Sequence, residues 1–165
     1  MSKSLENLKA AFAGESQANR KYTNFADKAD VEGHHQVAKL FRAAAAAEAI
    51  HARSHLKTME GIGSTEDNLK AAIAGEHYEV NSMYPAFLKE AEEENNAGAK
   101  RTFHDALEVE KTHEALYNKA LETLGKSAEA VDYYICPICG FTHEGPLSGR
   151  CPVCNAPGEK FFKVD

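Results

Sequence analysis

The four cysteines of this 165-residue chain form two short pairs, Cys136/Cys139 and Cys151/Cys154, each with a proline after its first cysteine. Two Cys-x-x-Cys pairs carried on turns supply four thiolates, which suit a tetrahedral zinc or a single iron. No cysteine is left over, and in a reducing compartment such a pattern indicates a metal site rather than disulfides. The pairs therefore predict a small module near the C-terminus whose metal supplies much of its folding energy.

A second set of candidate ligands lies upstream, where Glu-x-x-His occurs at Glu48/His51 and again at Glu110/His113. Residues three apart share one face of a helix, so each pair can bind the same ion. Mixed carboxylate and imidazole ligation suits iron or manganese, and ligand type alone leaves zinc open. One such motif is common by chance, so its interpretation depends on the rest of the chain.

An internal repeat supports the metal-binding interpretation. The segment 8–15, LKAAFAGE, recurs at 69–76 as LKAAIAGE, and each copy is followed by one Glu-x-x-His motif. The glutamates lie on apolar helix stripes, where an unpaired carboxylate is costly to bury. Six side chains are therefore expected to converge on cations: Glu15, Glu48, His51, Glu76, Glu110 and His113. This ligand set matches that of ferritin-like di-iron proteins.

The repeat is broken at Glu79, which has Ala18 as its counterpart in the first copy. Because Glu79 lies one helical turn after the repeated glutamate, we expect it to be a seventh ligand that makes the two metals inequivalent. Pro85 follows in the same helix and predicts a kink or bulge there. Tyr22 and Tyr84 are either core aromatics or donors that orient the carboxylates, and both interpretations stay open.

Helices are the elements expected to position these ligands. Residues 4–125 contain a single proline and are rich in helix-forming residues. Breaks near residue 33, at 61–65 and at 95–98 leave four helices, with Ser4 as the predicted cap of the first and Ser64 of the third. Short connections predict antiparallel neighbours.

The helical pattern stops before residue 133, where glycine, proline and aromatic residues become frequent. We therefore expect a mainly α protein of two domains. Residues 1–128 form an antiparallel four-helix bundle, and residues 129–165 form a small metal-binding domain with short β-strands.

The composition excludes some partners. The net charge is −6 and the pI is near 5.8, so no basic block is available for nucleic acid or an anionic membrane. No apolar run approaches the roughly 18–20 residues of a transmembrane helix. The first residues lack the apolar stretch of a signal peptide, which predicts a cytoplasmic protein.

With these features the chain resembles the rubrerythrins over essentially its whole length. The specific marks are Gly14-Glu15, Glu48-Ala49-Ile50-His51, Glu76-x-x-Glu79 with Met83-Tyr84-Pro85, Glu110-Lys111-Thr112-His113, and the cysteine quartet Cys136, Cys139, Cys151 and Cys154. The resemblance implies a ferritin-like bundle holding two non-haem irons and a C-terminal rubredoxin-like domain holding one iron. Zinc is an alternative metal for the four-cysteine site.

The resemblance also implies individual roles for the bundle ligands. Glu48 and Glu110 are expected to bridge the irons. Glu15 is expected to bind one iron terminally, and Glu76 with His113 to bind the other.

Glu79 and His51 are expected to alternate on the first iron, the carboxylate when the pair is oxidised and the imidazole when it is reduced. The implied activity is reduction of hydrogen peroxide to water, with rubredoxin or an NAD(P)H-dependent reductase as electron donor. Because the two sites of one chain are expected to lie far apart, the resemblance implies a head-to-tail homodimer or a higher homo-oligomer. Asn155 stands where the family has glycine after the second cysteine pair, and asparagine tolerates the left-handed backbone required there.

Two other functions remain open from the sequence. A ferroxidase or iron-handling protein would need the bundle alone, so Glu79 and the cysteine module weigh against it. A non-enzymatic zinc-ribbon adaptor would use the helices as structure only.

Overall fold

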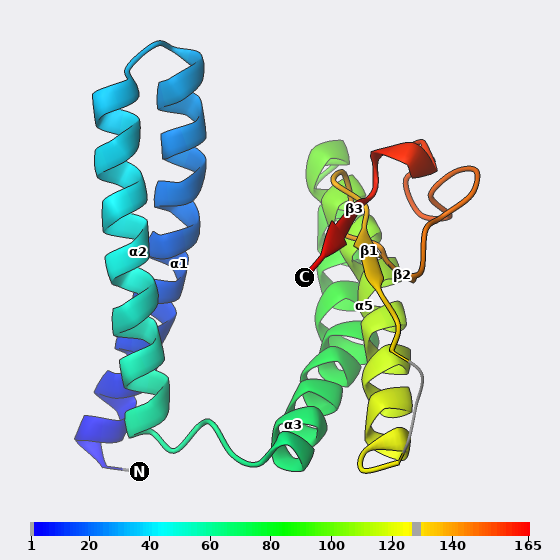
Figure 1. Ribbon diagram of the computed structural model, residues 1–165, viewed down its shortest axis with the longest axis horizontal. Coiled ribbons are helices and arrows are strands. Elements are labelled where there is room, and N and C mark those ends of the chain that lie inside the picture. The colour runs from blue at the N-terminus through cyan, green and yellow to red at the C-terminus, as the bar shows by residue number, and fades with distance from the viewer. Residues whose placement is uncertain (1, 127–129) are drawn as a thin grey trace. The chain divides into compact units, whose positions relative to one another are not determined.

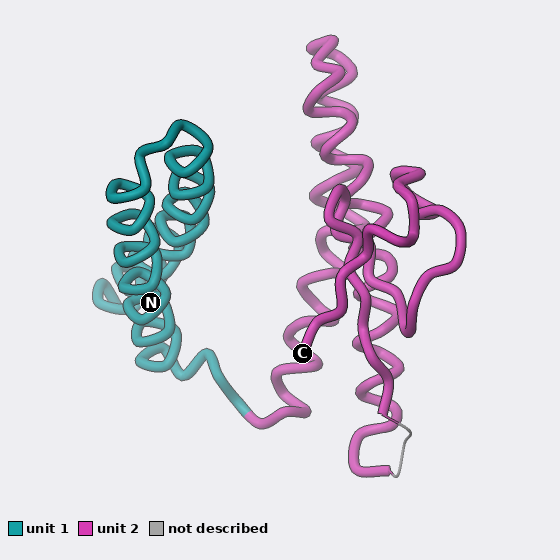
Figure 2. The backbone as a smooth tube through the Cα atoms, turned by 45° about the horizontal axis from the view of Figure 1, so that its top comes forward, with its two compact units in different colours: residues 1–63 teal, residues 64–165 magenta. Residues whose placement is uncertain are grey.

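The computed structural model describes residues 2–126 and 130–165. The chain forms two compact units, Met1–Gly63 and Ser64–Asp165 (Figure 2). The expected boundary between residues 128 and 129 lies outside the described residues and stays a prediction. No helix in the described part of the chain is both long and apolar enough to cross a membrane.

The first unit is a hairpin of α1 (Lys3–Val31) and α2 (His35–Thr58), which lie side by side in Figure 1. Gly33 has a φ of 81°, a left-handed conformation that suits glycine and lets the chain reverse between the helices. The expected cap at Ser4 is wrong, because α1 begins at Lys3 and the side chain of Ser2 accepts from the N–H of Leu5.

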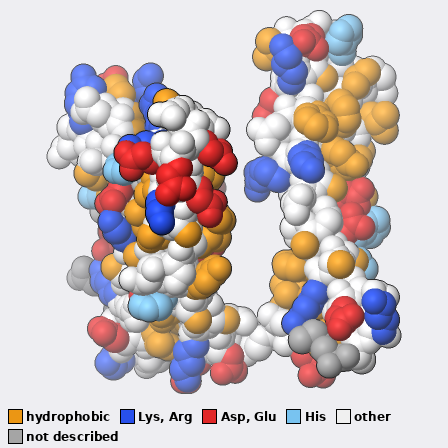
Figure 3. All heavy atoms as spheres, turned by 180° about the vertical axis from the view of Figure 1, so that it is seen from behind, with side chains coloured by type: hydrophobic (Ala, Val, Ile, Leu, Met, Phe, Trp, Pro, Cys, Tyr) orange, Lys and Arg blue, Asp and Glu red, His pale blue; other side chains and the backbone are white. Residues whose placement is uncertain are grey.

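Small side chains bring the two helices of this hairpin together. Ala26 and Ala38 are fully buried, and Asn19 Nδ2 donates to the carbonyl of Ala45 at 2.7 Å. Leu40 and Ile50 are 67% and 66% exposed, and Figure 3 shows hydrophobic side chains on the surface of this hairpin. The hairpin therefore buries only part of its apolar surface by its own packing.

The second unit begins with the expected third helix, which is divided into α3 (Thr65–Tyr78), the π-helix η1 (Glu79–Met83) and α4 (Tyr84–Glu93). Ser64 caps α3 as expected. The backbone N–H of Asp67 donates to the Ser64 hydroxyl, and the Asp67 carboxylate accepts from the Ser64 N–H, so the pair forms a capping box.

The π-helix confirms the irregularity predicted from Pro85. Tyr84 donates its N–H to the carbonyl of Glu79, five residues earlier, and Pro85 has no N–H with which to resume the α-helical pattern at once. The chain then turns at Asn95, which has a φ of 55°, and returns as α5 (Ala97–Thr123).

The C-terminal part of this unit is a three-stranded antiparallel sheet in the order β2-β1-β3. Its elements are β1 (Tyr133–Ile135), β2 (Thr142–Glu144), the short 3₁₀ helix η2 (Gly158–Lys160) and β3 (Phe162–Val164). The first residue of β1 pairs with the last residue of β2 and of β3. The mainly α fold with a small strand-containing cysteine module is therefore confirmed.

Candidate metal centres

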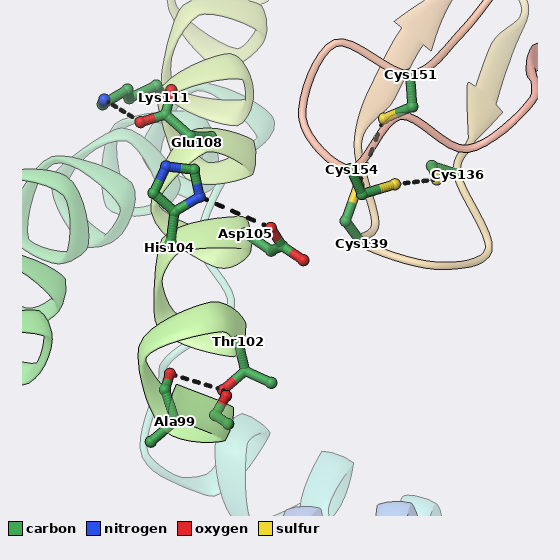
Figure 4. A network of polar contacts seen from close by, with 11 residues as sticks. Ala99, Thr102, His104, Asp105, Glu108, Lys111, Cys136, Cys139, Cys151 and Cys154 are labelled. Carbon is green, nitrogen blue, oxygen red and sulfur yellow. Dashed lines mark hydrogen bonds and ion pairs between the residues drawn. The ribbon is translucent and has the colours of Figure 1, made fainter. Parts of the chain in front are cut away.

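Four cysteine side chains converge between the two loops of the C-terminal module (Figure 4). The Sγ atoms of Cys136 and Cys154 are 3.5 Å apart, and those of Cys139 and Cys151 are 3.6 Å apart. Four sulfurs placed ~2.3 Å from a central ion would be separated by about 3.8 Å. The thiolates therefore fit one tetrahedral metal ion, as the sequence predicts.

The two cysteine loops have equivalent backbone geometry. Cys136 and Cys151 each donate an N–H to the carbonyl five residues later, at 2.9 and 2.8 Å. Gly140 and Asn155 occupy matching positions after the second cysteine of each loop, with φ values of 84° and 63°. The expectation that Asn155 accepts a left-handed backbone is confirmed.

Local hydrogen bonds make the four thiols inequivalent. Burial opposes ionisation of Cys136, but the backbone N–H groups of Cys139 and Ile138 donate to its sulfur and hold its pKa below that of a free thiol. Burial raises the pKa of Cys139 and of Cys154. A bound cation would offset this cost of charge, because metal ligation requires the thiolate form.

The first hairpin carries one group of oxygen and nitrogen ligands. Glu15 on α1 and Glu48 and His51 on α2 have donor atoms within 4.8 Å of one another. His51 Nδ1 lies 2.8 Å from Glu48 Oε2, one turn earlier on the same helix. The side chain of His51 is 56% exposed and that of Glu48 is 20% exposed.

The second hairpin carries the equivalent group from the repeat. Glu76 on α3 and Glu110 and His113 on α5 have donor atoms within the same 4.8 Å limit. His113 Nδ1 lies 2.6 Å from Glu110 Oε2 and 3.8 Å from Glu76 Oε1. Each hairpin therefore brings together the three predicted ligands that it contributes, with the histidine Nδ1 facing a carboxylate in both copies.

The carboxylates of the second ligand group are partly buried and repel one another. Burial, followed by the negative charge of Glu110, raises the pKa of Glu76 to about 7. Burial and the Glu110 charge also raise the pKa of Glu79. Carboxylates held this close without a counter-charge favour a cation among them.

Glu79 is not part of the three-residue ligand group, but its charge acts on the side chains of that group. It begins the π-helix, and its charge contributes to the raised pKa of Glu76. Burial raises the pKa of Tyr84, and among the negative charges that add to this shift Glu79 contributes most. Its role as a seventh ligand stays a prediction.

Both predicted tyrosines pack in three-ring clusters that repeat between the hairpins. Ring centroids in each cluster lie 5.4–6.3 Å apart. The clusters are Tyr22 with Phe25 and Phe41, and Tyr84 with Phe87 and Phe103. Both tyrosines thus pack against aromatic side chains, and the choice between a core role and a role in orienting carboxylates stays open.

A contact missed by sequence reasoning joins the cysteine module to the second ligand group. Thr142 Oγ1 of β2 lies 2.9 Å from His113 Nε2, and Lys119 of α5 forms an ion pair with Glu144 at 2.6 Å. Neither contact has a local sequence signal, because the partners are separated by more than twenty residues. One strand of the cysteine module thus touches the second ligand group, while the separation of the four-cysteine site from the bundle metals of one chain stays a prediction.

Comparison with known proteins agrees with this geometry. Residues 6–121 match the rubrerythrin family model, and residues 134–162 match the model described as rubrerythrin, rubredoxin-like domain. The chain is 35% identical to rubrerythrin-2 of Clostridium acetobutylicum, with 93% of this chain and 92% of that protein aligned. It is 37% identical to nigerythrin of Nitratidesulfovibrio vulgaris, with 95% of this chain and 84% of that protein aligned.

Solved structures give the same relationship. Partially reduced nigerythrin and fully reduced, all-ferrous nigerythrin each superpose with a TM-score of 0.60 at 36% identity. Each alignment covers 99% of this chain and 88% of the other. The chain therefore belongs to the rubrerythrin family of redox proteins, with a four-cysteine site and carboxylate–histidine groups that suit a di-iron centre.

Proposed function

We propose that this protein is a non-haem di-iron peroxidase that reduces hydrogen peroxide to water and receives its electrons through the iron of the four-cysteine site. The observation that carries the proposal is the pair of equivalent Glu-Glu-His groups, one on each hairpin, in a chain that also holds a four-thiolate site. An iron pair bound by the bundle ligands supplies two electrons, which with two protons convert one hydrogen peroxide to two waters.

The ligand roles follow the family resemblance. Glu48 and Glu110 would each bind both irons, with Glu15 on one of them and Glu76 and His113 on the other. The short contacts between each histidine and the glutamate one turn earlier support this assignment, because both side chains then reach the same ion.

Glu79 and His51 would exchange at the remaining ligand position of the first iron. A carboxylate is favoured when the pair carries more positive charge, and a neutral imidazole is sufficient when the pair is reduced. Glu79 begins a π-helix, a local irregularity often found at functional sites. Tyr22 and Tyr84 are assigned as side chains that orient the surrounding carboxylates.

Electron supply is assigned to the four-cysteine module, which carries one electron at a time. The contact of β2 with α5 supports such a relay, because it holds the module against the helix that carries Glu110 and His113. Rubredoxin or an NAD(P)H-dependent reductase is the proposed donor, in a cytoplasmic homodimer or higher homo-oligomer. A zinc-ribbon adaptor is not favoured, since the family consists of redox proteins.

The test is anaerobic. The iron-loaded protein is fully reduced, mixed with one equivalent of hydrogen peroxide per di-iron site, and followed by the visible absorption of the ferric four-cysteine site. We expect the colour to return within seconds and faster than with dioxygen. If the site stays reduced while peroxide persists, the peroxidase proposal is wrong. Faster oxidation by dioxygen, with iron accumulating beyond the bound complement, would instead establish a ferroxidase.

A further inference from the structure

One hydroxyl of the cysteine module contacts a ligand of the bundle. Thr142 Oγ1 lies 2.9 Å from His113 Nε2, while Nδ1 of the same ring faces Glu110 Oε2 at 2.6 Å. The two ring nitrogens are thus divided between two partners. Only Nδ1 is directed toward the carboxylates that could share a metal ion with it.

The strand that carries Thr142 makes a second, separate contact with α5. Alternate residues of a strand point to the same face, so Thr142 and Glu144 both face α5. Glu144 pairs with Lys119 through both carboxylate oxygens, at 2.8 and 2.6 Å. His143, between them, directs Nδ1 to the carbonyl of Gly145 within its own module.

The surroundings of the contact offer few other polar partners. A pocket of about 300 Å³ lies beside His113 and is lined mainly by apolar side chains, including Leu116, Tyr117 and Tyr133. The leucine and alanine side chains of this lining have no polar atom that could pair with His113 Nε2, whereas Thr142 Oγ1 lies within hydrogen-bond distance of it. Thr142 is therefore the hydrogen-bond partner of the imidazole on this side of the ring.

The hydroxyl can serve the metal-bound form of the ring. A metal at Nδ1 requires the ring proton to reside on Nε2, where it donates to Thr142 Oγ1. The hydroxyl hydrogen can then turn toward the carbonyl of Gly140, 3.4 Å away. Gly140 directly follows Cys139, so the chain of hydrogen bonds runs from the imidazole to a cysteine loop.

We propose that Thr142 is a positioning residue through which the cysteine module holds His113 of its own chain, with Nδ1 directed at Glu76 and Glu110. The inference deepens the proposed function and rests on its ligand assignment. Partners of metal-bound histidines fix the tautomer and orientation of the ring, and their loss typically weakens metal binding or activity by about 10–100-fold.

The experiment compares Thr142→Val, which removes the hydroxyl at nearly constant volume, with Thr142→Ser, which retains it. Full-length chains with the four-cysteine site loaded with iron and the bundle free of metal are titrated anaerobically with Co²⁺ by calorimetry. The visible spectrum of the thiolate-bound iron reports that the module has folded in each variant. We expect Thr142→Val to bind Co²⁺ about tenfold more weakly at the site that contains His113. Thr142→Ser should bind Co²⁺ there with near-parental affinity.

A second readout separates positioning from general stability. In the fully zinc-loaded chain, long-range ¹H–¹⁵N spectra report which nitrogen of His113 carries the proton. The parent and Thr142→Ser should show a slowly exchanging Nε2–H, and Thr142→Val should lose that protection. The control Lys119→Met breaks the ion pair with Glu144 and should leave the His113 signal in place.

Parental Co²⁺ affinity and a parental His113 signal in Thr142→Val would overturn the inference. Equal loss in Thr142→Ser, or loss of the same signal in Lys119→Met, would also overturn it, since docking rather than the hydroxyl would then hold the ring. Failure of the parent to bind a metal pair in the bundle would instead refute the proposed function. The two failures are therefore distinguishable.

Discussion

Replacing Glu79 by glutamine should have opposite effects on the metal-free and the iron-loaded protein. Without metal, Glu79 adds a negative charge to a region where Glu76 and Glu110 already repel each other, and its own pKa is raised by burial and by the Glu110 charge. With iron bound, the same carboxylate is the proposed exchangeable ligand. Glutamine keeps the size of the side chain and removes the charge.

The magnitude in the metal-free protein follows from the geometry. Glu76 and Glu79 are three residues apart, and like charges at this helical spacing destabilise by about 0.2–0.5 kcal/mol. Glu110 adds a second repulsion, which solvent screens because Glu79 is only half-buried. We therefore expect Glu79→Gln to raise the free energy of unfolding of the metal-free protein by about 0.5 kcal/mol, or its Tm by about 1–2 °C.

Two assays measure the two effects. Thermal unfolding of the metal-free chain at pH 8, where Glu76 with its pKa of about 7 is mostly ionised, gives the stability change. Iron analysis of the loaded variant should find both bundle irons and the thiolate-bound iron retained. Stopped-flow mixing with hydrogen peroxide should show turnover slowed by about tenfold or more, because a group that tunes the metal has been lost.

Glu90→Gln is the matched control, since it removes one exposed carboxylate from α4 of the same helical segment. It should leave turnover at the parental rate. Unchanged peroxide turnover in Glu79→Gln, with both irons bound, would make Glu79 a bystander. A lower Tm of the metal-free variant would refute the argument from charge repulsion.

Three further substitutions test the module and the first hairpin. Cys151→Ser should preserve one reductive turnover of a prereduced iron pair and abolish donor-fed steady-state activity; a parental steady-state rate would refute the relay. Gly158→Ala places a Cβ against the backbone carbonyl of Leu147, so the free energy of unfolding of the module should fall by about 2–3 kcal/mol. On heating, the colour of its ferric site should therefore disappear at a lower temperature than in the parent. Asp30→Asn should lower Tm at neutral pH, because hydrogen bonds from Arg42 and His35 hold the pKa of Asp30 below 3.8. That stability is present above pH 3.8 and is lost as pH falls through the folded pKa, so circular dichroism melts of parent and variant should converge in acid.

Local patterns were enough to predict most of the fold and the grouping of the ligands. Helix periodicity places Glu48 with His51 and Glu110 with His113, because residues three apart share a face regardless of what packs against the helix. The Ser64 capping box and the bulge before Pro85 also depend on near neighbours only. Even so, the cap of the first helix was misplaced by two residues, since two serines compete at that end.

Contacts between distant segments were decided only by the tertiary structure. The approach of Glu76 to Glu110 and His113 depends on how α3 packs against α5, and the raised pKa of Glu76 depends on the burial that results. No periodicity or motif in the sequence predicts the contact of Thr142 with His113. It arises because β2, whose position is set by pairing in its sheet, lies against α5 in the folded unit. The sequence alone thus determined which side chains can bind metal. Packing decided which of them lie close enough to repel each other, how far each is buried, and which hydrogen-bond partners each has.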